Sequence, residues 1–141
     1  MTGQGKVLII DDEESMRIAC RQTLEMAGYS TVTAENGEYG LERSRQESFD
    51  VALLDLRMPG LPGIEVLKKL RQESPNTAVI IITGHGSIES AVQAIKLGAY
   101  DYLPKPFTPE ALIAQVRRAE TAARRALENA CVGEGLERKM L

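Results

Sequence analysis

The sequence Val7-Leu8-Ile9-Ile10-Asp11-Asp12-Glu13 joins four apolar residues to three acids. An apolar run without alternation is typical of a strand with both faces covered, as in parallel sheets flanked by helices. Residues 51–54 and 78–82 have the same character, and shorter strands are expected at 31–33 and 100–103, the last stopped by Pro104. The sequence therefore predicts five strands, most of them buried on both sides.

The segments between these strands have the apolar spacing of helices. Residues 16–24, 64–70 and 88–95 repeat apolar positions every three to four residues, and a shorter, more polar helix is expected at 37–46. Gly28, Gly98 and the Ser74-Pro75-Asn76 cluster stand where helices should end. Strands that alternate with helices predict a parallel, doubly wound α/β sheet with right-handed crossovers.

The bulk properties of the 141-residue chain exclude several classes of protein. A net charge of −3 argues against a direct nucleic-acid surface, which needs clustered Lys and Arg. The polar start and the short apolar runs predict neither a signal peptide nor a membrane span, so a cytoplasmic location is expected. Cys20 and Cys131 lack the spacing of a metal or redox motif, and we interpret both as free thiols in a reducing compartment.

The last predicted helix begins with favourable residues, Thr108 as N-cap and Pro109 at the first helical position. A seven-residue repeat then continues beyond the expected end of a small domain, and we expect Gly133 and Gly135 to end the helix. We therefore divide the chain into a domain at 1–120 and a linker helix or tail at 121–141. After residue 118, two interpretations stay open. One is an alanine-rich helix packed on the sheet, and the other is a short coiled coil or inter-domain linker, of which the coiled coil would support a homodimer.

Chemically reactive side chains gather where the predicted strands end. The first strand ends in Asp11-Asp12-Glu13, the third in Asp55 and the fourth in Thr83-Gly84, while Lys105 follows the fifth. Functional sites of doubly wound sheets lie at this carboxyl edge. Carboxylates crowded there require a cation, and oxygen ligands suit Mg²⁺. An aspartate beside a metal and a lysine is a competent phosphoryl acceptor.

With these motifs in this order, residues 5–120 resemble the receiver domain of two-component response regulators. The resemblance rests on residues 7–13, 53–60, 82–84 and 103–107. It implies a flavodoxin-like (βα)5 fold with strand order 2-1-3-4-5 and an extended C-terminal helix. It also implies a phosphorylation-activated signalling switch that receives its phosphoryl group from a histidine kinase.

The resemblance assigns roles to individual residues. Asp55 would be the phosphoacceptor, and Mg²⁺, which Mn²⁺ can replace, would be held by Asp55, Asp12, Asp11 and the backbone carbonyl of Arg57. The remaining roles are phosphoryl binding by Thr83, Gly84 and Lys105, switching by Thr83 and Tyr102, a cis bond at Lys105-Pro106, and tuning of phosphoryl lifetime by Arg57 and His85. One departure is Leu61-Pro62-Gly63, where many relatives have Asp or Asn as a helix cap.

Residues 83–92 and 96–102 are similar to receivers of NtrC-type activators, which precede a sigma-54-interacting ATPase and a DNA-binding domain; FixJ-type regulators share part of this pattern. The chain itself contains no Walker or helix-turn-helix motif. The implied partners are a sensor histidine kinase and an output domain. Alternatives are a receiver-like interaction module that takes no phosphate, a receiver of a hybrid histidine kinase, or a phosphatase-like enzyme. Arg57 stands where such phosphatases usually carry a second Asp, so we expect a regulatory domain and not a turnover enzyme.

Overall fold

Strands and helices alternate along the whole described chain, which comprises residues 5–84 and 88–140, with side chains described for all of these except 88 and 129–140. The strands of this computed structural model are β1 (Lys6–Ile10), β2 (Ser30–Ala34), β3 (Val51–Asp55), β4 (Ala78–Thr83) and β5 (Asp101–Pro104). The helices are α1 (Glu14–Met26), α2 (Gly37–Gln46), α3 (Gly63–Glu73), α4 (Ile88–Lys96) and α5 (Pro109–Met140). The predicted order of elements is confirmed.

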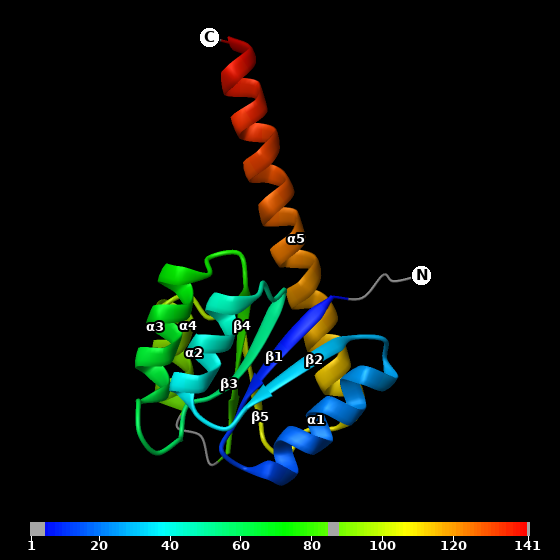
Figure 1. Ribbon diagram of the computed structural model, residues 1–141, viewed down its shortest axis with the longest axis vertical. Coiled ribbons are helices and arrows are strands. Elements are labelled where there is room, and N and C mark those ends of the chain that lie inside the picture. Colours follow the sequence, from blue (N-terminus) through cyan, green and yellow to red (C-terminus); the bar gives the residue numbers. More distant parts are fainter. Residues whose placement is uncertain (1–4, 85–87, 141) are drawn as a thin grey trace.

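All strand pairs are parallel, and the sheet has the order β2-β1-β3-β4-β5. Helices α1 and α5 cover one face, and α2, α3 and α4 cover the other (Figure 1). Successive residues of a strand point to opposite faces. Leu8 and Ile10 accordingly belong to the core beneath α2 and α3, whereas Val7 and Ile9 belong to the core beneath α1 and α5. These two cores explain why β1, β3 and β4 are apolar without alternation.

The helix boundaries follow local backbone chemistry. Gly28 and Gly98 have φ values of +99° and +108° just after α1 and α4, a conformation that glycine adopts without steric cost. The amide of Ala111 donates a 3.1 Å hydrogen bond to the Thr108 hydroxyl, which confirms the predicted N-cap of α5. Helix α3 ends at Glu73, immediately before the Ser74-Pro75-Asn76 cluster.

Two predicted boundaries were wrong. Strand β5 begins one residue late, at Asp101, and includes Pro104, which pairs with Thr83. A proline is tolerated there because β5 is an edge strand and Pro104 ends it. Helix α5 continues through Gly133 and Gly135 to Met140. A glycine costs a helix only about 1 kcal/mol relative to alanine, so good helix formers on both sides carry the helix past it.

The entry to α3 shows how the Leu61-Pro62-Gly63 departure is accommodated. Pro62 occupies the N-cap position and supplies no side-chain hydrogen bond, but the Leu61 amide donates to a Glu38 carboxylate oxygen of α2 at 3.3 Å. Gly63 is packed so closely that a Cβ there would lie 2.5 Å from the Leu56 Cα. Helix α3 therefore starts directly against the loop that follows Asp55.

The described residues form no helix that is both long and apolar enough to span a membrane. The Cys20 thiol is free, as predicted, and it is buried in the core between α1 and the sheet. The side chain of Cys131 lies outside the described part of the chain.

Candidate functional site

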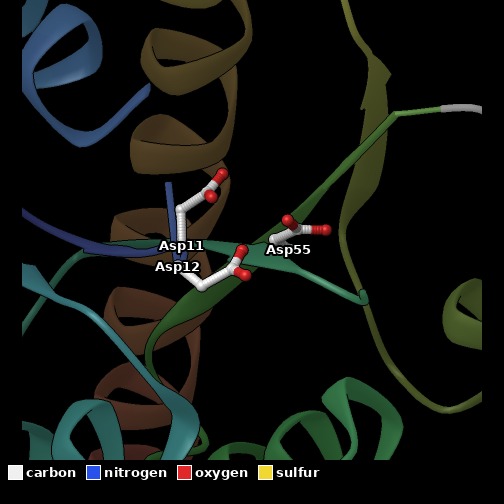
Figure 2. A group of neighbouring side chains, drawn as sticks. All are labelled: Asp11, Asp12 and Asp55. Atoms are coloured by element: carbon white, nitrogen blue, oxygen red, sulfur yellow. The ribbon is translucent and has the colours of Figure 1, made fainter. Parts of the chain in front are cut away.

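The predicted gathering of carboxylates at the carboxyl edge is present. Asp11 and Asp12 follow β1, and Asp55 ends β3; in the β1–β3 register, Ile10 lies beside Leu54. One carboxylate oxygen from each of the three aspartates lies within 4.8 Å of the others. Figure 2 shows the three side chains as neighbours at the ends of these two strands. Asp11 and Asp55 are buried, whereas Asp12 is exposed.

Asp11 is fixed by hydrogen bonds on every side. Its amide donates to the Ala34 carbonyl at 3.1 Å, and its Oδ1 accepts the Glu13 amide at 2.9 Å. Its carbonyl accepts a 2.8 Å bond from the Arg17 guanidinium. Its Oδ2 accepts the Lys105 ammonium at 2.9 Å. The loop that carries the acidic pair is thus held rigidly, with the Asp12 carboxylate left facing solvent.

Lys105 reaches the aspartates from the loop after β5. Its ammonium contacts Asp11 at 2.9 Å, Asp55 at 3.4 Å and the exposed Glu13 at 3.5 Å. Burial by itself would lower the pKa of Lys105, but the hydrogen bond and charge of Asp11 and the charge of Asp55 outweigh it, so the pKa lies above its usual value. Lys105 is therefore a fixed cation between two buried carboxylates. The Lys105-Pro106 peptide bond is cis, as the resemblance implied.

Asp55 is held in a polar but buried position. Its Oδ1 accepts the Arg57 amide at 2.9 Å, and its Oδ2 faces Lys105. Burial is the main reason why the pKa of Asp55 is raised; the Arg57 amide and Lys105 oppose this effect, and the Asp11 charge adds to it. A buried carboxylate with a raised pKa beside two others is a site that gains from a bound cation.

The other predicted residues lie around this cluster. Thr83 is buried at the end of β4, and Gly84, which follows it, has open space where a Cβ would stand. Arg57 is exposed beside Asp55. Tyr102 on β5 is 40% exposed, and its backbone carbonyl accepts a 3.2 Å hydrogen bond from the side-chain Nε2 of Gln115. His85 lies outside the described residues.

Arg17 is a residue of this site that the sequence reasoning missed. It lies in the first turns of α1, where a positive charge is disfavoured by the helix dipole. This unfavourable position was the signal in the sequence that could have revealed the role of Arg17, because a cation at a helix start needs a nearby acceptor to stabilise it. The partner is the Asp11 carbonyl, which only the folded loop presents.

A doubly wound parallel sheet with an aspartate trio and a lysine at its carboxyl edge defines a flavodoxin-like domain with a site suited to a divalent cation and a phosphoryl group. The response regulator receiver domain family matches residues 7–117. The chain belongs to this family, whose members are phosphorylation-activated switches.

Similar proteins agree with this assignment. The chain is 43% identical over 126 residues to the C4-dicarboxylate transport transcriptional regulatory protein DctD of Pseudomonas aeruginosa, covering 89% of this chain and 27% of that protein. It is 42% identical to the DNA-binding transcriptional regulator NtrC of Escherichia coli, covering 82% and 25%. A response regulator receiver domain from Clostridium thermocellum superposes with a TM-score of 0.80 at 36% identity, covering 86% of this chain and 97% of that one. The chain thus spans about a quarter of the length of these curated regulators.

Proposed function

We propose that Asp55 is the residue that accepts the phosphoryl group. The observation that carries the proposal is the position of its carboxylate, which the Arg57 amide holds at 2.9 Å and the Lys105 ammonium faces at 3.4 Å. In the transfer, the Asp55 carboxylate attacks phosphorus, the bond from phosphorus to the donor histidine nitrogen breaks, and that nitrogen recovers a proton. Lys105 then faces the negative charge on the transferring oxygens.

The donor set of the site fits Mg²⁺, with Mn²⁺ as a substitute. Asp12, whose carboxylate is exposed, would be a direct ligand of the metal. Asp55 and the Arg57 carbonyl would be the other ligands that the protein supplies. Asp11 already accepts hydrogen bonds at both carboxylate oxygens, so it acts chiefly by orienting Lys105 and, through water, by adding charge. When bound, the metal supplies positive charge that offsets the repulsion between the carboxylates and the incoming phosphate.

The change in surface starts at Thr83 and ends at Tyr102. A phosphoryl group at Asp55 adds roughly −1.5 to −2 charges and three acceptor oxygens. The Thr83 hydroxyl, which lies 3.5 Å from the Gly84 carbonyl, turns toward those oxygens, and Gly84 leaves room beside them. The exposed Tyr102 ring then rotates into the vacated space. The exposed Arg57 stands beside the acceptor and tunes the phosphoryl lifetime. The same role is proposed for His85 from the sequence alone, since His85 lies outside the described residues.

The partners follow from this mechanism and from the relatives. A sensor histidine kinase donates the phosphoryl group, and residues 1–120 form the receiver while 121–141 lead to an output region. The DctD and NtrC relatives are transcriptional regulators about four times longer than the match, which supports an output in transcription control. From the sequence resemblance to NtrC-type activators, we propose that this output passes through a sigma-54-type ATPase and a DNA-binding domain. The domain is a cytoplasmic regulator and not a turnover enzyme, and the projecting helix offers a surface for a homodimer.

Acetyl phosphate with Mg²⁺, followed by intact mass measurement, tests the proposal. The wild-type protein should gain one phosphoryl mass, and the gain should disappear with EDTA and in Asp55→Asn. A gain that survives Asp55→Asn would move the acceptor elsewhere. No gain in the wild type would support the alternative of a receiver-like interaction module.

A further inference from the structure

The end of the sheet opposite the aspartates holds a second polar cluster. Helix α5 runs along the sheet beside α1 and then projects beyond the domain at the end where β1 begins (Figure 1). Its buried apolar residues in the core are Leu112, Val116 and Ala119, with Ala111 and Ile113 partly buried against the same core, whereas Ala126 is already exposed. Apolar burial therefore fixes the first part of α5 but contributes little where the helix leaves the domain.

At the point of exit, α5 buries a carboxylate. Glu120 is only 6% exposed, and its Oε1 accepts a 3.0 Å hydrogen bond from the hydroxyl of Tyr29, which lies just before β2 and is 3% exposed. Burial and the Glu120 carboxylate raise the pKa of Tyr29 to about 12. A buried carboxylate is strongly unfavourable unless it is paired, so this bond holds the two residues together.

Arg124, one turn further along α5, extends the cluster to the other strands. Its Nη2 lies 2.9 Å from Glu120 Oε2, and its Nε lies 3.9 Å from Asp50 Oδ1, just before β3. Asp50 Oδ2 in turn accepts the Lys6 amide at 2.9 Å, at the start of β1. Through two of its side chains, α5 is thus joined to the starting ends of three strands.

The packing around these carboxylates is tight. A Cβ on Gly5 would lie 2.2 Å from Asp50 Oδ2 and 2.7 Å from Glu120 Oε2. The backbone that enters β1 therefore passes directly against both carboxylates. The Gly5 backbone therefore limits how far the two carboxylates can move on that side, and a charge-assisted contact is directional as well as strong.

We propose that Tyr29, Asp50, Glu120 and Arg124 form an exit anchor that fixes the direction in which α5 leaves the domain. The anchor makes the projecting part of α5 a rigid extension of the sheet. Whatever follows the helix is then held in a set orientation to the domain. The anchor stands whether or not Asp55 accepts phosphate, because none of its members touches the aspartate cluster.

Amide hydrogen exchange of the full chain tests the anchor. Tyr29→Phe removes only the hydroxyl, and Arg124→Met removes the charge while keeping a flexible apolar stem. Both should speed exchange of amides in residues 117–128 by about tenfold, the usual effect of losing one hydrogen bond to a charged group, while strand amides change much less. Tyr39→Phe makes the same change as Tyr29→Phe on a 44% exposed ring and should leave α5 unaffected.

Unchanged exchange in 117–128 for both anchor variants would overturn the proposal. Equal acceleration of α5 and of the strand amides would also overturn it, since that pattern reports a general loss of stability. The phosphorylation assay of Asp55 should be normal in both variants, which separates a failure of the anchor from a failure of the proposed function.

Discussion

The Lys105 ammonium donates a 2.9 Å hydrogen bond to Asp11, a residue 94 positions earlier in the chain. The pair joins the loop after the first strand of the chain to the loop after the last one. In the sheet, β1 lies inside and β5 lies at the edge. The same ammonium reaches Asp55 at 3.4 Å. One cation therefore balances the charge of two buried carboxylates. Its removal should lower the free energy of unfolding as well as the reactivity of the site.

Lys105→Met should lower the free energy of unfolding by about 3 kcal/mol at pH 7 in EDTA, because it leaves Asp11 and Asp55 buried without their cation. Added Mg²⁺ should restore part of the loss. Urea denaturation measures both effects. Lys68→Met is the matched control, since Lys68 and Glu65 form an exposed pair at 3.6 Å whose loss should change stability little. Equal effects of the two substitutions would contradict the role of Lys105.

Asp55→Asn should stabilise the metal-free protein by on the order of 1 kcal/mol at pH 7. Burial raises the pKa of Asp55, so the native state binds its proton more readily than the unfolded chain does. The unfolding free energy therefore falls as the pH rises through the raised pKa. The difference between Asn and Asp should therefore shrink as the pH falls through the raised pKa, and it should be lost below about 4, the ordinary carboxyl pKa. Denaturation curves from pH 3 to 8 without metal check this, and a constant difference would argue against it.

Cys20 should resist alkylation in the folded protein. Burial, followed by the Asp11 charge, raises the pKa of its thiol to about 11, and the side chain is 1% exposed. At pH 8 roughly one thiol in a thousand would be ionised. Iodoacetamide labelling of a Cys131→Ser variant can be followed by mass spectrometry. Labelling of Cys20 should be slow in buffer and fast in about 6 M urea, which unfolds the protein. Rapid labelling without urea would show that the α1 core opens readily.

Gly63→Ala should destabilise the domain by about 2 kcal/mol and slow phosphorylation of Asp55. The added Cβ would lie 2.5 Å from the Leu56 Cα and 2.8 Å from its carbonyl oxygen, and backbone atoms cannot rotate away. Relief requires α3 to move from the loop after Asp55. Gly133→Ala in α5 is a useful comparison, because alanine there favours the helix. Thermal unfolding should separate the two variants, and equal melting points would refute the clash.

Much of the site was predictable because its parts carry local signals. Recognisable strands end at or just before Asp11, Asp12, Asp55, Thr83 and Lys105, and parallel strands place their carboxyl ends at one edge. The contact between Arg17 and the Asp11 carbonyl was not predictable from spacing alone, since it depends on the path of the loop. The same holds for Glu38, which accepts the Leu61 amide in place of a side-chain cap on α3.

The amino-acid sequence by itself determined the alternation of strands and helices, the family, and the candidate residues at the strand ends, because apolar periodicity and short motifs are local properties. Only the tertiary structure decided which carboxylates are buried, what Lys105 contacts, and how α5 leaves the domain. Those features depend on distances between segments far apart in the chain. Tyr29 and Glu120 are 91 positions apart, and neither belongs to a motif; their hydrogen bond exists because the fold buries both at the same end of the sheet.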